Sequence, residues 1–162
     1  FGINERKDCL SWVRYAVERF GEDTEIVLSG VSMGAATVLM ASDLGLPKNV
    51  KAIVADCGYS SPKAIINKVM RDSGLPDKLM YPFVWLGAMV FGKFNLTESS
   101  AVSAVIIHVG ADDFVPCYMA EEIYKACRSE KKLLIVPGAG HGMSYLVDKD
   151  LYEKTVKDFI KI

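Results

Sequence analysis

The chain has 162 residues, of which 51% are hydrophobic and 24% are charged, so it suits one domain with a substantial core and is too apolar for intrinsic disorder. Lys and Arg number 19 against 20 Asp and Glu, which gives a net charge of −1. Because binding to phosphate backbones needs a basic surplus, we expect no nucleic-acid partner.

The cysteines are widely spaced and form neither a CxxC pair nor a cluster with histidine; they are Cys9, Cys57, Cys117 and Cys127. This spacing argues against a structural zinc site, a redox motif and a disulfide framework. We therefore expect no metal, no cofactor and a reducing, cytoplasmic location. The first seven residues do not combine a charged start with an apolar run, so they do not resemble a signal peptide.

Helix-like and strand-like segments alternate along the chain. In chain order the pattern predicts a helix from the N-cap Asn4 to Gly21, a strand over 25–29, a helix over 33–44, a strand over 50–55, a helix over 62–71, an apolar helix over 79–91, a strand over 104–109, a helix over 118–129, a strand over 132–136 and a helix over 145–162. Strands that alternate with helices indicate a parallel sheet with helices on both faces, so the fold class is α/β.

The most apolar stretch, 79–91, is shorter than the roughly 20 residues that a bilayer core requires, and Lys78 and Lys93 bracket it. We therefore expect no membrane span. Two interpretations stay open, a buried helix and a lid over an active site, because both need apolar surface.

We expect a lid insertion over 59–100 within a core formed by 1–58 and 101–162. The candidate residues for its substrate pocket are Met80, Phe83, Trp85 and Met89.

Residues 30–34, Gly-Val-Ser-Met-Gly, match G-x-S-x-G between an apolar strand and a helix rich in small residues. This arrangement is typical of a nucleophile elbow, in which a strained turn exposes the hydroxyl of the serine, here Ser32. The backbone N–H of Met33 would lie at a helix N-terminus, where it can stabilise an oxyanion. The alternative is a glycine-rich turn with an idle serine.

A serine nucleophile needs a base, and the chain contains two histidines. His141 lies in the glycine-rich loop 137–142 after the last strand and is the expected base. His108 lies inside the apolar strand 104–109, so we expect it to be packed and hydrogen-bonded in the core.

Three carboxylates are candidates for the acid that orients the base. Asp112 and Asp113 directly follow the third strand, and Asp56 ends the second. Every candidate lies just after the carboxyl end of a strand, where open α/β sheets bind their ligands. The order serine, acid, histidine is the one that a nucleophile elbow on this architecture requires.

These motifs resemble those of the α/β-hydrolases, the serine-hydrolase superfamily, and in particular of bacterial cytosolic esterases and serine aminopeptidase-like enzymes. The matching stretches are E-R-K-D-C-L-S-W at 5–12, the elbow at 28–40, A-D-C-G-Y-S-S-P at 55–62, A-D-D-F-V-P at 111–116 and G-A-G-H-G at 138–142. The resemblance covers the C-terminal part of that fold and implies three α/β/α layers with a mostly parallel sheet. It also implies that Asp112, four residues before the proline, is the acid, with Asp113 as its exposed neighbour.

The same resemblance implies that the first strands of the fold and the loop with the second oxyanion donor are not in this chain. Strand 25–29 would then have an open, apolar edge, so we expect an upstream segment or a second copy of the chain to pair there. The expected activity is cleavage of an ester, thioester or amide in a small acyl substrate through Ser32, His141 and Asp112. The alternatives are a truncated, non-catalytic chain or interaction module, and another enzyme on the same fold.

Overall fold

Four parallel strands form the sheet of this computed structural model, which describes residues 1–92, 104–128 and 130–161. The strands are β1 (Ile26–Val31), β2 (Val50–Asp56), β3 (Ala104–Val109) and β4 (Lys131–Val136). They lie in the order β1-β2-β3-β4, so strands that are consecutive in the sequence are neighbours in the sheet. The predicted α/β class with a parallel sheet is confirmed.

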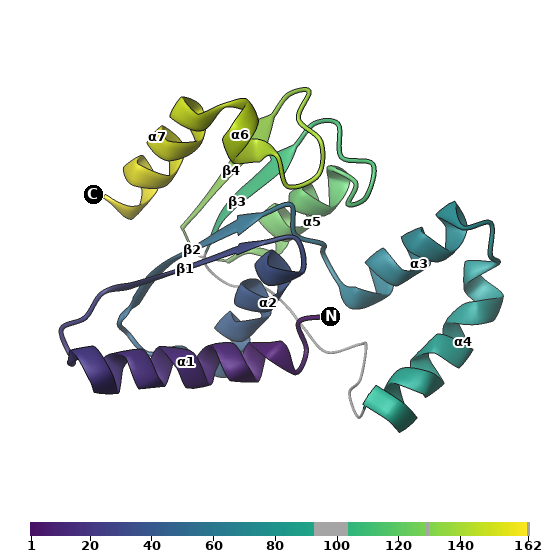
Figure 1. Cartoon of the computed structure of the whole chain (residues 1–162), viewed down its shortest axis with the longest axis horizontal. Coiled ribbons are helices and arrows are strands. Elements are labelled where there is room, and N and C mark those ends of the chain that lie inside the picture. The colour runs from purple at the N-terminus through teal and green to yellow at the C-terminus, as the bar shows by residue number, and fades with distance from the viewer. Residues whose placement is uncertain (93–103, 129, 162) are drawn as a thin grey trace.

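Helices cover both faces of the sheet (Figure 1). One face carries α1 (Glu5–Phe20), α2 (Met33–Ala41) with its 3₁₀ extension η1 (Ser42–Leu44), and α5 (Tyr118–Ala126). The opposite face carries α6 (Ser144–Val147) and α7 (Lys149–Ile160). The three-layer arrangement follows from this distribution.

The central strands are buried on both sides because successive side chains of a strand point to opposite faces. Ile53 and Ile106 pack toward α2 and α5, whereas their neighbours Val54 and Ile107 pack against α7. Such double burial is typical of parallel sheets and explains why these strands read as continuous apolar runs.

Two further helices, α3 (Pro62–Asp72) and α4 (Asp77–Gly87), with the π-helical turn η2 (Ala88–Gly92), stand to one side of the sheet (Figure 1). Helix α3 begins where Ser61 Oγ accepts the backbone N–H of Ala64 at 3.2 Å. Helix α4 packs through Met80 and Trp85 against a core that α3 helps to form. Within the described residues no helix is both long and apolar enough to span a bilayer.

The predicted closing helix 145–162 is wrong in one respect, because two helices replace it. Asp148 leaves the helical region of backbone space at φ −141° and ψ 79°, and its carboxylate accepts the backbone N–H of Leu151 at 3.0 Å. This side-chain cap ends α6 and starts α7. The predicted lid boundary at 100 and the predicted helix ends at 129 and 162 lie outside the described residues.

Strand β1 is at the edge of the sheet. Among the described residues it pairs with β2 alone. Val27 and Val31 are exposed on it, at 39% and 50% of their surface. The described part of the chain therefore has the open apolar edge that the sequence predicts.

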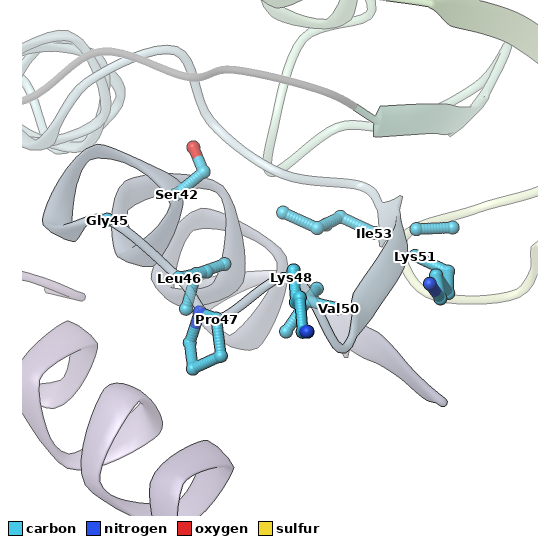
Figure 2. A pocket seen from close by; sticks show the side chains of 9 residues that line it. Ser42, Gly45, Leu46, Pro47, Lys48, Val50, Lys51 and Ile53 are labelled. Carbon is cyan, nitrogen blue, oxygen red and sulfur yellow. The ribbon is translucent and has the colours of Figure 1, made fainter. Parts of the chain in front are cut away.

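A cavity of about 320 Å³ lies at the amino end of β2, beside the loop that follows η1 (Figure 2). Its lining combines Ser42 with apolar and lysine side chains and includes neither a histidine nor a carboxylate. Lys48 and Lys51 are its titratable lining residues, and no base and carboxylate accompany Ser42 there.

Candidate active site

The turn between β1 and α2 places Ser32 in a strained conformation, with φ 55° and ψ −116°. Such a backbone costs on the order of 1–3 kcal/mol and persists only where neighbours hold it. Here the backbone N–H of Ser32 donates to the carbonyl of Asp56 at 2.8 Å, and the carbonyl of Ser32 accepts from Ala36 at 3.1 Å. The expected strand-turn-helix elbow is present.

The two glycines of the motif contribute unequally to this turn. A Cβ added to Gly30 would lie 2.3 Å from the carbonyl carbon of Gly34, so strand and helix approach too closely for any side chain there. A Cβ added to Gly34 would meet no described atom within 4 Å outside its chain neighbours and the backbone of its own helix. The close approach therefore requires glycine at position 30 and not at position 34.

His141 lies between Ser32 and Asp112 and contacts both. Its Nε2 is 2.9 Å from Ser32 Oγ, and its Nδ1 is 2.8 Å from Asp112 Oδ2. The imidazole is partly exposed, whereas the side chain of Asp112 is fully buried. With the proton on Nδ1 facing the carboxylate, Nε2 is free to accept the serine proton.

The backbone of its own loop holds Asp112 in this position. Its Oδ1 accepts the N–H of Phe114 at 2.9 Å and the N–H of Val115 at 2.7 Å, which leaves Oδ2 for His141. Asp113 is exposed, and its carbonyl accepts a hydrogen bond from the Lys68 ammonium. Of these two neighbours the structure brings Asp112 to the histidine.

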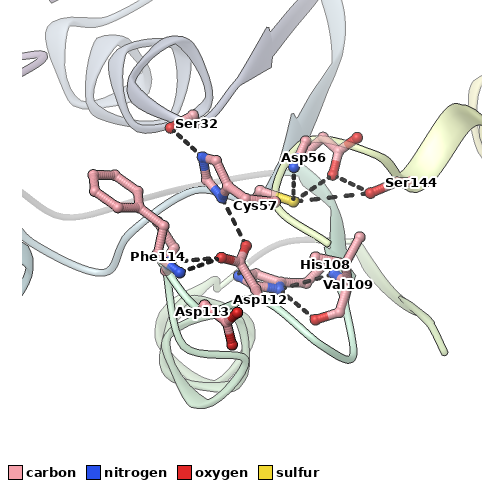
Figure 3. A network of polar contacts seen from close by, with 12 residues as sticks. Ser32, Asp56, Cys57, His108, Val109, Asp112, Asp113, Phe114 and Ser144 are labelled. Atoms are coloured by element: carbon pink, nitrogen blue, oxygen red, sulfur yellow. Dashed lines mark hydrogen bonds and ion pairs between the residues drawn. The ribbon is translucent and has the colours of Figure 1, made fainter. Parts of the chain in front are cut away.

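The third candidate acid, Asp56, belongs to a separate buried network. Its Oδ1 accepts hydrogen bonds from Ser144 Oγ at 2.5 Å and from Cys57 Sγ at 3.1 Å (Figure 3). The Cys57 sulfur in turn accepts the backbone N–H of Gly142 at 3.4 Å. Asp56 thus ties the end of β2 to the loop that carries His141.

Sequence reasoning missed this network, because Cys57 and Ser144 are 87 positions apart and no local pattern contains both. Burial, reinforced by the neighbouring Asp56 carboxylate, raises the pKa of the Cys57 thiol to about 12. The thiol therefore stays protonated and serves as a hydrogen-bond donor. The structure also shows backbone strain at this residue, because Cys57 has a positive φ of 53°, which is uncommon for a non-glycine residue.

Potential metal ligands meet at one place in the described part of the chain. The ligand atoms of Cys57, His108 and Asp112 lie within 4.8 Å of one another. The carboxylate already accepts three hydrogen bonds, and the Cys57 thiol is protonated and donates to Asp56, so both groups are engaged within the protein. The donor set fits hydrogen bonding within the protein better than metal ligation.

Met33 is the first residue of α2. Because the first N–H groups of a helix have no acceptor within the helix, its backbone N–H is available to an oxyanion beside Ser32. This position agrees with the role expected for Met33.

A cavity of about 360 Å³ opens beside the nucleophile, and apolar side chains form nearly all of its walls. It is lined by Phe1, Ser32, Met33, Tyr59, Ile65, Ile66, Val69, Met70, Val84 and Phe114. Phe114 also packs edge-on against the His141 ring, with the ring centroids 5.2 Å apart.

The four expected lid residues are not in this lining. Met80 and Trp85 pack into the core beneath α3, while Phe83 and Met89 are exposed. Val84 is the residue of α4 that reaches the cavity. The hydrophobicity of the segment could indicate a lid, but not which face of α4 turns toward the serine.

No protein-family model matches the chain. Among curated proteins it is similar to the uncharacterized protein YqkD of Bacillus subtilis, with 24% identity over 169 residues that cover 99% of this chain and 55% of that protein. It is also similar to the uncharacterized protein YfhR of Escherichia coli K12, with 26% identity over 137 residues that cover 83% of this chain and 45% of that protein. The chain spans about half the length of the curated relatives it matches.

Solved structures of similar fold include an esterase of Pyrococcus furiosus, Pf2001, with a TM-score of 0.60 and 20% identity over 95% of this chain and 60% of that one. An alpha-beta serine hydrolase homologue from Coxiella burnetii matches with a TM-score of 0.54 and 17% identity over 97% of this chain and 59% of that one. These likenesses and the parallel sheet show that the chain has the α/β-hydrolase fold, of which it contains a part.

Proposed function

We propose that the protein is a serine hydrolase that cleaves an ester, thioester or amide of a small acyl substrate. One observation supports this proposal most strongly: the hydrogen-bonded series from Ser32 Oγ through His141 to Asp112 Oδ2, with contacts of 2.9 and 2.8 Å. A nucleophile, a base and an orienting acid in such contact are the arrangement that catalyses acyl transfer through a covalent intermediate. The fold shared with an esterase and with serine hydrolases agrees with this reaction class.

In the proposed reaction, Ser32 Oγ attacks the acyl carbonyl carbon while His141 Nε2 takes the serine proton. The Met33 N–H stabilises the oxyanion that forms, and the buried Asp112 carboxylate balances the charge of the imidazolium. His141 then gives the proton to the leaving group, which departs and leaves an acyl-enzyme. A water molecule, activated by the same histidine, releases the acid and restores the serine.

The cavity beside Ser32 favours an apolar acyl group. Of its lining residues only Ser32 and Tyr59 carry a polar side-chain group, and none has a charged side chain. Burying an unpaired charge there would be far more unfavourable than burying methylene groups, which gain about 0.8 kcal/mol each. We therefore expect uncharged acyl esters to be cleaved in preference to esters of dicarboxylic or amino acids.

Helices α3 and α4 contribute five of the cavity-lining residues: Ile65, Ile66, Val69, Met70 and Val84. On this basis we propose segment 59–100 as the lid of the site. A carboxylesterase-like activity is the simplest form of the proposal, with thioesterase and peptidase activities as its variants. A reducing, cytoplasmic location, which the wide spacing of the cysteines in the sequence favours, remains part of the proposal.

Labelling with a fluorophosphonate probe tests the proposal, because the probe phosphonylates an activated serine. We expect the wild-type protein to be labelled and the Ser32→Ala variant to remain unlabelled. An unlabelled, folded wild type would overturn the proposal. That result would favour the second candidate, a non-catalytic interaction module, which the open edge of β1 and the partial coverage of the relatives support.

A further inference from the structure

A second histidine approaches the acid of the proposed triad from the side of the sheet. His108, in β3, is fully buried, and its Nε2 has no hydrogen-bond partner among the residues that the structure describes. That nitrogen lies 3.9 Å from Asp112 Oδ2, the same oxygen that accepts from His141 Nδ1 at 2.8 Å. One carboxylate oxygen therefore lies within reach of two imidazole rings.

The other ring nitrogen of His108 can be satisfied in either tautomer. Nδ1 is 2.9 Å from the backbone nitrogen of Val109 and 3.0 Å from its carbonyl oxygen, so it can accept from the former or donate to the latter. The backbone contacts therefore do not decide where the proton is. The surroundings of Nε2 must decide it.

The neighbouring carboxylate favours a proton on Nε2. If Nδ1 carried the proton, the lone pair of Nε2 would face the Asp112 anion across 3.9 Å of protein interior, which is repulsive. With the proton on Nε2, the N–H dipole faces the same anion and attracts it. Because charge interactions are strong in a buried, low-dielectric site, this difference selects the Nε2–H form.

The other groups that face the carboxylate supply no permanent cation. From its own loop come two backbone N–H groups, those of Phe114 and Val115. From the end of β2 comes the Cys57 thiol, which is protonated and uncharged. From the β4–α6 loop comes His141, whose charge changes during the proposed reaction.

We propose that His108 is a positioning residue for the triad: as the Nε2–H tautomer it holds Asp112 Oδ2 in line with His141 and stabilises the carboxylate as an anion. The inference rests on the proposed function, in which Asp112 must stay ionised to pair with the imidazolium. Among the described residues, His108 is the buried histidine with a ring nitrogen that has no hydrogen-bond partner, and the proposal gives this ring a role.

The first test uses the wild-type protein and does not depend on activity. Two-bond ¹H–¹⁵N correlation NMR distinguishes the tautomers of a histidine, and the signals of His108 are identified by their loss in His108→Gln. We expect a protonated Nε2 and an unprotonated Nδ1. A protonated Nδ1 with an unprotonated Nε2 would overturn the proposal, whether or not the protein is a hydrolase.

The second test compares two substitutions at the same position. His108→Leu removes the donor and keeps an apolar side chain, whereas His108→Gln keeps an N–H donor at the end of the side chain. In the Leu variant we expect kcat to fall about 10- to 100-fold with KM unchanged, which is the size expected for the loss of one interaction with a charged group. In the Gln variant we expect most of the wild-type kcat to be restored. The low-field proton resonance of the His141–Asp112 hydrogen bond should shift in the Leu variant and return toward its position in the Gln variant.

Thr155→Val is the matched control, because Thr155 is also a buried polar residue but lies on α7. It should lower the melting temperature without changing kcat. Equal losses of kcat in the two His108 variants, or a wild-type kcat in His108→Leu, would overturn the positioning role. If His108→Leu does not fold, the tautomer of the wild type decides. Failure of fluorophosphonate labelling would instead refute the proposed function and leave the tautomer result standing.

Discussion

Replacing Asp112 with asparagine should remove catalysis while keeping the fold. The substitution changes one oxygen to an NH₂ group of nearly the same size, so the packing around the buried side chain is preserved. The two backbone N–H groups of Phe114 and Val115, at 2.9 and 2.7 Å, require an acceptor and will hold the amide oxygen in the place of Oδ1. The NH₂ group must then take the place of Oδ2, 2.8 Å from His141 Nδ1.

This forced orientation reverses the hydrogen-bonding roles of the two ring nitrogens of His141. An NH₂ group donates to Nδ1, so the ring carries its proton on Nε2 and donates to Ser32 Oγ instead of accepting from it. Rotating the amide by 180° would avoid this reversal, but it would turn the NH₂ group toward the N–H groups of Phe114 and Val115 and remove their acceptor, which costs about 1–3 kcal/mol for a buried donor. We therefore expect kcat to fall by about 10⁴, as for the same change in other Ser-His-Asp hydrolases, which corresponds to about 5 kcal/mol of transition-state stabilisation.

The assay is hydrolysis of p-nitrophenyl butyrate, with thermal unfolding as a check that each variant is folded. Asp113→Asn is the matched control, since Asp113 is exposed and contacts Lys68 through its backbone carbonyl. It should keep kcat/KM within about twofold, as surface changes usually do. A folded Asp112→Asn variant that keeps more than a tenth of the wild-type kcat/KM would refute the assignment, and so would an equal loss in Asp113→Asn.

Ser32→Ala should reduce ester hydrolysis by several orders of magnitude, because nucleophile and base act as one unit; near-full activity in a steady-state assay would contradict the triad. Gly30→Ala should prevent folding, since its Cβ would lie 2.3 Å from a backbone carbon, whereas Gly34→Ala should fold; circular dichroism of the pair checks this, and equal effects would argue against the close approach. The 162-residue chain should self-associate in analytical ultracentrifugation and do so less when Val27→Lys puts a charge on β1; a stable wild-type monomer would argue against edge pairing. Cys57 should resist iodoacetamide at pH 8, because a pKa of about 12 leaves on the order of 10⁻⁴ of the thiol ionised; rapid alkylation of the folded protein, measured by peptide mass spectrometry, would disagree.

The local motifs of the site could be predicted from the sequence because each is a short signal with a structural reason. The G-x-S-x-G pattern places Ser32 on its turn, and the strand before it needs no other information to be recognised. The choice between Asp112 and Asp113 is different, since both follow β3 and only the resemblance to known hydrolases favoured the first. In the structure two backbone N–H groups hold the Asp112 side chain, and the composition of the loop does not reveal that geometry.

Contacts between distant residues and local preferences that oppose each other account for the features that the sequence pattern did not predict. The contacts of Ser144 with Cys57 and Asp56 join residues 87 and 88 positions apart, so no short window of sequence contains them. The helical periodicity of 145–162 continues through Asp148. The Asp148 carboxylate nevertheless accepts the backbone N–H of Leu151, and this cap divides the segment into two helices. Periodicity also shows that α4 is apolar without showing which of its sides meets the cavity.

The geometry of the candidate site depends on the correct pairing of β3 with β4. Asp112 follows β3 and His141 follows β4, and the register that sets His108 against Ile135 fixes how far each loop extends. A slip of one residue would displace one loop by about 3.3 Å along the strand, and an error of about 1 Å is enough to reduce catalysis strongly. Both strands are apolar along their centres, so a misaligned molecule could still be compact and rich in secondary structure. The fraction of molecules that react with a serine-directed probe would therefore report the fraction with native register, which circular dichroism alone cannot distinguish.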